Sequence, residues 1–386
     1  MTSLDVITTY SLLMITLFFS FSMGQRLRLG KLLPFSLFLY HSAFCAFYWH
    51  WSLDYGADSS MYYLKSFIID YTFRPGTYFV ISFVKIFTNN LHLSLFNTFL
   101  IFNFIGLFGL LLLANVLKSL WPYRRGYMKF IPYIILFLPG LSFWSSAIGK
   151  DTPAFFAICL AIFALMNITK RKHLFIIAIV LMFTIRPHIA LLMVGAASVA
   201  LASAKDVKII HRFAFSIVAT IAGFFAFNFT MQYIGLGSDV GISGIIEYIL
   251  GRQDQNLGGG SSINIKDMGL PMKLFSYLFR PLFIDTSGVL GFVVSVENVI
   301  LLSLVFLFIP MGIFTITSGN HAAVRFNIIF VIAGLLLLSL TTANMGISIR
   351  QKTMLLPSIF FLIAVIANVR YRKKAKYLNR YTHETE

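Results

Sequence analysis

The chain has 386 residues, of which 58% are hydrophobic and only 12% are charged. Soluble domains carry roughly twice that share of charged residues, so the composition excludes an ordinary soluble protein and indicates an integral membrane protein. The net charge of +17 could suggest a nucleic-acid partner, but the basic residues gather in short breaks between apolar segments, as they do in cytoplasmic loops.

Taken in chain order, the apolar segments predict an all-α polytopic membrane protein with eleven transmembrane helices. A helix needs about 20 apolar residues to cross the hydrocarbon layer. Residues 1–386 are therefore interpreted as a single integral membrane domain, with its N-terminus outside. The first segment is followed rather than preceded by basic residues, so we expect an uncleaved span rather than a secretory signal. The predicted spans are 4–23, 32–51, 94–117, 130–147, 153–168, 174–185, 188–204, 213–234, 289–315, 325–343 and 354–369.

Basic residues in alternate breaks set the expected orientation. The positive-inside rule assigns such breaks to the cytoplasm. Few acidic residues share them, so the excess charge is explained by topology and no nucleic-acid partner is expected. The breaks contain Arg26, Arg28 and Lys31; Lys118, Arg124, Arg125 and Lys129; Lys170, Arg171 and Lys172; Lys205, Lys208 and Arg212; Arg325; and the basic tail 370–386.

The stretch TIRPHIALL, residues 184–192, interrupts a long apolar run with an arginine, a proline and a histidine. Both flanks of the run carry cytoplasmic-type charges, so the chain has to cross and return within residues 173–204. We therefore expect a short hairpin whose turn, at Arg186, lies near the outer surface. A single tilted helix is the alternative, but Pro187 disfavours it and Arg186 would then lie in the middle of the hydrocarbon.

Three outer segments are more than simple turns. Residues 52–90 begin with SLDYGADSSMYY and end with an apolar stretch that predicts a short interfacial helix. Residues 235–288 contain LGGGSS, a predicted hinge between the arms IIEYIL and MKLFSYLF. Residues 344–352, NMGISIRQK, form a short polar loop on this interpretation. Long loops of this kind are usually functional or disordered.

Arginine precedes proline at three positions, Arg74, Arg186 and Arg280. Proline is favoured at the first position of a helix, so each pair predicts an arginine at a helix entrance. Lys150, followed by Asp151 and Pro153, repeats this arrangement. A helix N-terminus attracts phosphate, and arginine adds a bidentate donor, so these groups predict a diphosphate site facing outward. An outer arginine can instead extend to the interface or pair with an acid, which we favour for Arg74 and Lys85.

Four side chains are candidates for acid–base chemistry: Asp58, Asp151, His188 and Glu297. Asp58 lies in the GADS motif just after the second span, where a carboxylate could deprotonate a sugar hydroxyl; the alternative is an Asx turn or helix cap. His188 could simply hydrogen-bond within the bundle. Glu297 could pair with a neighbouring helix, although an acid inside a membrane is a functional candidate by default.

Metal and cofactor signatures are missing from the sequence. It has no His-x-x-x-His pair, paired cysteines or dense carboxylate cluster, so neither a transition metal nor another cofactor is expected. Cys45 and Cys159 fall in apolar spans and are interpreted as small buried residues. The sequence also shows no internal repeat, which weighs against transporters built from inverted repeats.

Several motifs together resemble bacterial polysaccharide polymerases of the Wzy or EpsG-like group. The resemblance is carried by GADSSMYY, LPGLSFWSSAIGKD, IRPH, LFRPLF followed by VSVEN, and NMGISIRQK, in that order along the chain. It implies a glycosyltransferase-C-like membrane fold in the bacterial inner membrane. It also implies an enzyme that joins oligosaccharide units carried on undecaprenyl diphosphate at the outer face, into an O-antigen, capsule or exopolysaccharide, without nucleotide sugars.

The resemblance further implies that outer basic residues bind the lipid diphosphate or the glycan. Arg186, Arg280 and Arg350 lie in the corresponding loops. Lys150 and Arg252, two further basic residues on the outer side, are expected in the same role from the sequence itself. Asp58, Asp151 or His188 would deprotonate the acceptor hydroxyl. Expected partners are the lipid-linked oligosaccharide, membrane lipids and, as a candidate, a chain-length regulator. An O-antigen ligase using the same donor and a polysaccharide flippase or exporter are the alternative functions.

Overall fold

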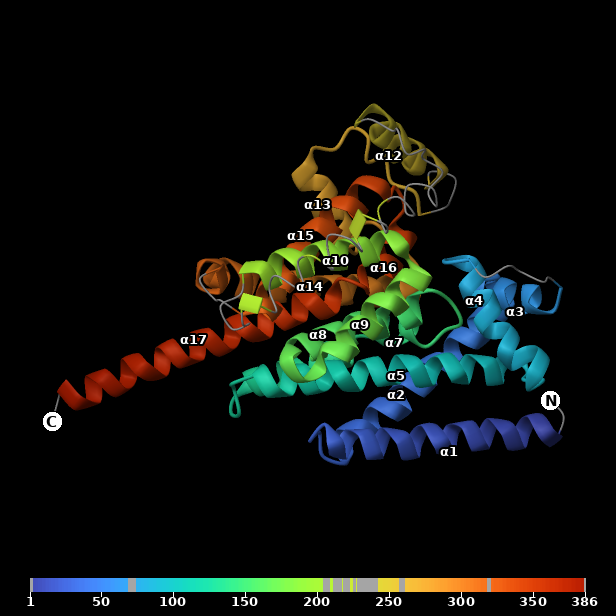
Figure 1. The fold of residues 1–386 in the computed structure, drawn as a ribbon, viewed down its shortest axis with the longest axis horizontal. Coiled ribbons are helices and arrows are strands. Elements are labelled where there is room, and N and C mark those ends of the chain that lie inside the picture. Colours follow the sequence, from blue (N-terminus) through green and yellow to red (C-terminus); the bar gives the residue numbers. More distant parts are fainter. Residues whose placement is uncertain are drawn as a thin grey trace.

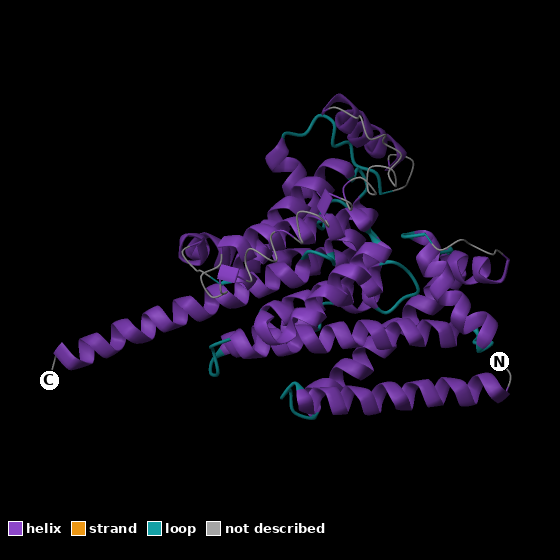
Figure 2. Cartoon of the chain, viewed as in Figure 1, coloured by secondary structure: helices purple, strands orange, loops and turns teal. Residues whose placement is uncertain are grey.

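The computed structural model describes residues 3–68, 74–203, 242–256, 261–317 and 321–384, with short pieces at 209–210, 217, 223–224 and 227. Every named element in these parts is a helix, as Figure 2 shows. This confirms the predicted all-α class for the described residues. The predicted span 213–234 and most of the LGGGSS hinge lie outside them.

The N-terminal half contains long apolar helices and, between them, short helices on the outer segment 52–90. The long elements begin where basic or polar breaks end, as the sequence predicts. The elements are α1 (Ser3–Arg26), α2 (Leu32–Tyr55), α3 (Asp58–Ile68), α4 (Thr77–Lys85), η1 (Ile86–Asn90), α5 (Leu95–Leu120), η2 (Tyr127–Phe130), α6 (Ile131–Leu136), α7 (Pro139–Ser145), α8 (Asp151–Leu165), α9 (Ile168–Ile185) and α10 (Pro187–Ser203).

The C-terminal half contributes two helices from the large outer segment and four that return to the bundle. Figure 1 shows α12 and α13 above the bundle and α17 extending away from it to the chain end. The elements are α12 (Ile242–Asn256), α13 (Leu270–Phe279), α14 (Gly288–Thr317), α15 (Ala322–Thr341), α16 (Met345–Lys352) and α17 (Leu356–Glu384).

Six helical segments in the described residues are long and apolar enough to cross a membrane, and a seventh is added if α16 and α17, bent by 56°, form one span. The six are Ser3–Arg26, Leu32–Tyr55, Leu95–Leu120, Tyr127–Ser145, Gly288–Pro310 and Ala322–Thr341. The protein is therefore an α-helical, membrane-embedded protein. Helices α8 and α10 are apolar but shorter, so the predicted number of eleven spans remains a prediction.

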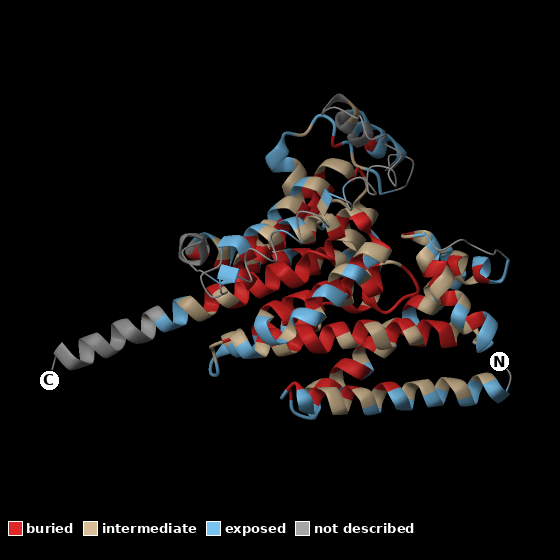
Figure 3. Ribbon diagram, viewed as in Figure 1, coloured by how far each residue is buried: buried red, intermediate tan, exposed pale blue. Residues whose placement is uncertain are grey.

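The core of the bundle is formed by α5, α8, α9, α10, α15 and α17. Helix α5 packs against α1, α2 and α8, while α8 packs against α9, and α10 against α15. In Figure 3, α8 is almost entirely buried, whereas most residues of α1 are intermediate or exposed. Large apolar side chains are exposed along α1, for example Ile7, Met14 and Phe18. In a membrane protein such residues face lipid, which is consistent with the position of α1 at the edge of the bundle.

One glycine permits a close helix contact. A Cβ at Gly106 of α5 would lie 1.8 Å from the carbonyl oxygen of Ser145 at the end of α7. No larger residue fits there without separating the two helices. This approach fixes the end of α7 just before the loop that carries Lys150.

Two predictions about outer segments prove wrong. The polar segment 344–352 is a helix, α16, because the Asn344 side chain accepts a hydrogen bond from the backbone N–H of Ile347 at 3.2 Å and caps it. Arg280 does not mark a helix entrance: it follows the end of α13, and α14 begins only at Gly288. The intervening chain turns because Asp285 accepts a hydrogen bond from the N–H of Leu282 at 2.8 Å.

Candidate functional site

Asp151 joins two arginines that are distant in the sequence. One carboxylate oxygen accepts a hydrogen bond from Nη2 of Arg186 at 2.6 Å, and the other accepts one from Nε of Arg350. Arg350 also donates to a carboxylate oxygen of Asp58, at 2.6 Å. We call the connected residues Asp58, Asp151, Arg186 and Arg350 the ion-pair cluster. Four predicted site residues thus lie together, although they come from four separate segments of the chain.

Helix ends position this cluster. Asp58 is the first residue of α3, and Asp151 is the first residue of α8, with Pro153 in the same turn. Arg186 directly precedes α10, which begins at Pro187. The hairpin predicted at TIRPH is therefore present, with its turn at the arginine. Three helix N-termini, each a positive dipole end, meet at the cluster.

The two carboxylates differ in their surroundings. The Asp151 side chain is 7% exposed and accepts hydrogen bonds from two arginines, whereas the Asp58 side chain is 50% exposed and pairs with one. A buried, doubly paired carboxylate holds its charge and fixes its neighbours. Asp58 has the access to solvent that a proton acceptor needs. The geometry therefore distinguishes the two acids, which the sequence alone did not.

Lys150 adds a third cation beside the cluster. Burial, followed by the nearby guanidinium groups of Arg186 and Arg350, lowers the pKa of Lys150 to about 8. The carboxylates of Asp58 and Asp151 act in the opposite direction but do not outweigh these effects. Three cations thus face two carboxylates, which leaves a net positive charge at this end of the bundle.

His188, on the first turn of α10, is surrounded by cations. Arg186, Arg252 and Lys150 all lie within electrostatic range of its imidazole. Arg252, on the exposed helix α12, also donates a hydrogen bond to Gln255 at 3.2 Å. His188 and Arg252, both predicted site residues, therefore lie around the ion-pair cluster. The positive charges near His188 favour a bound anion there over a role for His188 in proton transfer.

Three tyrosines border the cluster and were not singled out by the sequence. Tyr62 is buried in α3, one turn after Asp58, and Tyr48 approaches from α2; both lie within electrostatic range of Asp58, Asp151 and Arg350. The hydroxyl of Tyr277 is buried near Arg186 without a hydrogen-bond partner in the described residues. The spacing of four residues between Asp58 and Tyr62, once 58–68 is recognised as a helix, would have indicated Tyr62.

A cavity of about 500 Å³ is lined in part by α16. Ile349, next to Arg350, lines it together with Met345 and Gly346. Five aromatic side chains from α2 and α7 form another wall: Phe44, Phe47, Trp51, Phe143 and Trp144. Helix α16 thus contributes Ile349 to the cavity and Arg350 to the ion-pair cluster.

Glu297 lines the same cavity from α14 rather than joining the ion-pair cluster. Its carboxylate accepts a hydrogen bond from the N–H of Gly140 at 2.7 Å, and a Cβ at Gly140 would lie only 2.6 Å from that carboxylate. The buried ammonium of Lys352 lies within electrostatic range and donates a hydrogen bond to Asn298. Glu297 therefore has a structural partner and also faces the cavity.

Arg280 pairs with Asp285, which also lines the cavity. Nε of Arg280 donates to Asp285 at 2.9 Å, and Nη2 donates to the other carboxylate oxygen. These hydrogen bonds lower the pKa of Asp285. The structure thus places Arg280 with the cavity, while Arg186 and Arg350 belong to the ion-pair cluster. Among the described residues, no group of three or more His, Cys, Asp or Glu is arranged to hold a metal ion.

Comparison of the chain with family models, curated proteins and solved structures finds no match. The chemistry of the cluster and the cavity therefore has to be inferred from their own residues. A net positive, partly buried centre beside an aromatic-lined cavity suits a ligand with an anionic part and a carbohydrate or apolar part.

Proposed function

We propose that the protein is a membrane glycosyltransferase that polymerises lipid-diphosphate-linked oligosaccharide units into a surface polysaccharide. The proposed location is the outer face of a bacterial inner membrane. The observation that supports this most directly is the ion-pair cluster with Lys150, an excess of positive charge at one end of an apolar bundle. The order of motifs that resembles Wzy and EpsG-like polymerases supports the same function.

In this proposal the diphosphate of the donor binds at the cluster. Arginine has five N–H donors, and pairing with Asp151 occupies only part of each guanidinium. Nε of Arg186 is buried without a hydrogen-bond partner in the described residues, so at least one of its donors is not satisfied by the protein. The N-termini of α8 and α10 add backbone donors beside it. Lys150, which has no ion pair within the described chain, supplies the unbalanced positive charge.

The proposed reaction is a single transfer. The acceptor hydroxyl attacks the anomeric carbon of the sugar on the donor, a new glycosidic bond forms, and the bond from that carbon to the diphosphate oxygen breaks. The lipid diphosphate leaves with the bonding electrons and is stabilised by Lys150, Arg186 and Arg350. The hydroxyl proton passes to the carboxylate of Asp58. Asp151 holds the two arginines in place.

The aromatic-lined cavity is the proposed site for the sugars of the acceptor. Aromatic side chains present flat apolar faces that sugar rings can stack on, and Glu297 and Asp285 offer hydrogen-bond acceptors for hydroxyl groups. Ile349 and Arg350 are consecutive residues of α16 and face the cavity and the cluster respectively. A sugar in the cavity would therefore lie near the bound diphosphate.

The affinity for the donor is expected to fall as the pH rises through about 8, the pKa of Lys150. A diphosphate esterified at both ends stays fully ionised in this range, so the change comes from the protein. Between about pH 7 and about pH 9 the protonated fraction falls roughly tenfold, and the KM for the donor should rise accordingly. In the Lys150→Arg variant, whose side chain stays charged, the KM should change little over this range. A wild-type KM that does not depend on pH would contradict the role of Lys150.

The length distribution of surface polysaccharide tests the proposed activity. Deletion of the gene is expected to leave only single-repeat forms, because units are still made and transferred but not joined. Complementation with the wild-type chain should restore the ladder of lengths. Loss of every form, including the single repeat, would instead indicate a ligase or a flippase.

A further inference from the structure

A second cavity of about 500 Å³ lies at the opposite end of α8 from the ion-pair cluster. Phe163, which lines this cavity, follows Asp151 by 12 positions in α8, so the two residues lie about 18 Å apart along the helix axis. Helix α9 spans the same interval, from Arg171 to the residue before Arg186. The second cavity is therefore separate from the proposed reaction site. It is called the basic pocket below.

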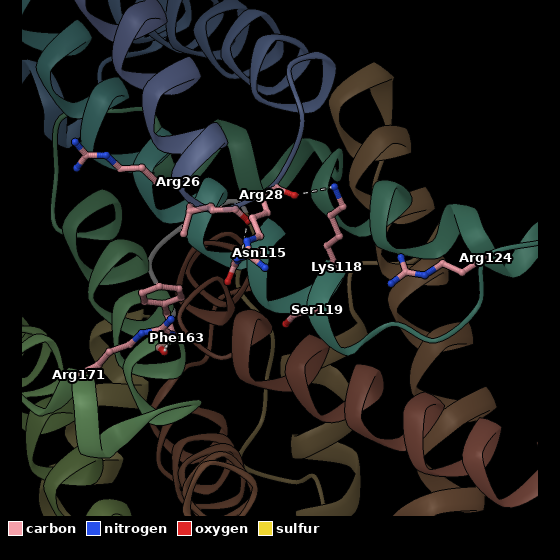
Figure 4. Close-up of a pocket in the computed structure, with 9 residues that line it drawn as sticks. Arg26, Arg28, Asn115, Lys118, Ser119, Arg124, Phe163 and Arg171 are labelled. Atoms are coloured by element: carbon pink, nitrogen blue, oxygen red, sulfur yellow. Dashed lines mark hydrogen bonds between the residues drawn. The ribbon is translucent and has the colours of Figure 1, made fainter. Parts of the chain in front are cut away.

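The basic pocket gathers cations from four parts of the chain. Arg26 and Arg28 come from the end of α1 and the following turn, Lys118 from α5, Arg124 from the loop after α5, and Arg171 from α9. Figure 4 shows these five side chains at the lining of the pocket, with the guanidinium of Arg26 directed away from the other four. None of its nine lining residues is acidic: the others are Leu27, Asn115, Ser119 and Phe163. Like charges in a concave site repel one another and raise the local positive potential, so an anion is favoured there.

Two of these cations are held in place by the protein. Nζ of Lys118 donates to the carbonyl oxygen of Arg28 at 3.0 Å. The guanidinium of Arg171 lies over the ring of Phe163, 3.8 Å from its centroid, and donates to the carbonyl oxygen of the same residue at 2.9 Å. These contacts already hold the two side chains in place. Because ordering a long side chain costs conformational entropy, a ligand that binds here loses less free energy than one that binds freely moving surface lysines.

The turn after α1 also belongs to this arrangement. Arg28 has a φ of +56°, which is uncommon for a residue with a side chain, and its neighbours Leu27 and Leu29 are buried. Asn115 of α5 donates to the carbonyl oxygen of Leu27 at 2.8 Å. Two side chains of α5, Asn115 and Lys118, thus fix the turn, and Arg28 remains exposed.

We propose that the basic pocket binds the phosphate group of an anion, supplied either by the headgroup of an anionic membrane lipid or by a soluble phosphate. Basic pockets between membrane helices are suited to anionic headgroups because apolar acyl chains can lie against the neighbouring helices. The exposed apolar side chains of α1 begin at Phe18, about 12 Å along the helix axis from Arg26, so an acyl chain that runs from the headgroup along α1 would reach them. The ligand would brace α1, α5, α8 and α9 at the end remote from the reaction site.

Native mass spectrometry of the purified full-length protein tests this proposal. Wild type should retain phosphatidylglycerol in clear preference to phosphatidylcholine with the same acyl chains. Lys118→Gln with Arg171→Gln should weaken that preference roughly tenfold or more, because each basic residue near a lipid phosphate contributes on the order of 1 kcal/mol. The matched control is Lys31→Gln with Lys172→Gln, which removes the same charge from two exposed residues outside the pocket. This control variant should prefer phosphatidylglycerol as strongly as wild type does.

Two further arms complete the experiment. The charge-keeping variant, Lys118→Arg with Arg171→Lys, should recover the preference, which separates loss of charge from misfolding. The second arm adds millimolar inorganic phosphate, with chloride at equal ionic strength as its control, to distinguish the two sources of the phosphate group. If phosphate displaces the bound lipid, soluble phosphate is the ligand. If the lipid stays bound, the lipid is the ligand. Equal loss in the pocket and control variants would overturn the proposal. So would a wild type that neither prefers phosphatidylglycerol nor retains inorganic phosphate.

Discussion

Replacing Asp58 by asparagine is expected to lower the rate of glycosyl transfer by about 10²- to 10⁴-fold while the protein remains folded. The Asp58 side chain is 50% exposed and has one ion-pair partner, Arg350. Asparagine keeps its shape but cannot accept the proton of the acceptor hydroxyl. The measurement is the initial rate of polymer extension by purified protein at saturating donor, so that kcat rather than binding is compared.

Asp54→Asn is the matched control for this variant. Asp54 lies four residues earlier, its side chain is 57% exposed, and its partner is His50 at 3.9 Å. The Asp54→Asn variant should extend polymer at the wild-type rate. A rate for Asp58→Asn within a factor of about three of wild type would exclude Asp58 as the proton acceptor and return the assignment to Asp151 or His188.

Asp151→Asn is expected to be the most destabilising substitution in the ion-pair cluster. The side chains of Asp151 and Arg186 are 7% and 10% exposed, and Arg350 also depends on the same carboxylate. Removing one partner of a buried ion pair costs about 3–5 kcal/mol, because the charge left behind is neither solvated nor paired. The loss of stability is measured as a fall in the thermal unfolding temperature of the purified variant.

A double substitution separates this explanation from a simple packing defect. Combining Asp151→Asn with Arg186→Gln removes the pair rather than one member of it. The combined loss of stability should therefore be smaller than the sum of the two single losses. An additive result, or a single variant as stable as wild type, would show that the ion pair does not hold this end of the bundle together.

The position of the ion-pair cluster was largely predictable because proline and charge fix helix ends. Pro187 begins α10 and Pro153 lies in the first turn of α8. These two residues place Arg186 and Lys150 at the ends of apolar helices, where a charged side chain can reach water. The apolar stretch at the end of segment 52–90 likewise forms helix α4 as expected.

The arrangement of α16 could not be predicted, because its residues are mostly polar and its stability depends on contacts from elsewhere. Its cap, Asn344, is a local signal, but the helix also packs against α13 and α7. Only in the folded chain do Arg350 and Asp151, 199 positions apart, meet. Pairing across such distances follows from tertiary packing and leaves no local pattern in one sequence.

Tertiary packing also explains why some predicted site residues lie in the ion-pair cluster and others lie at the aromatic-lined cavity. The sequence grouped Arg280 with the other outer arginines and identified Glu297 as an acid within a predicted span. In the structure Arg280 pairs with Asp285, and Glu297 binds the backbone of Gly140. Both are thereby connected with the aromatic-lined cavity. In the proposed function they help to position the acceptor rather than the leaving diphosphate.

The central claim is tested most directly by adding a defined undecaprenyl-diphosphate-linked repeat unit to the purified full-length protein in vesicles, without nucleotide sugars. Wild type is expected to produce a ladder of lipid-linked oligomers, one repeat unit apart. Arg186→Ala and Arg350→Ala should each slow its formation by about 10²-fold, because each removes a donor to the leaving diphosphate. Absence of a ladder with wild type, or a full ladder with both variants, would contradict the proposed activity or the proposed site respectively.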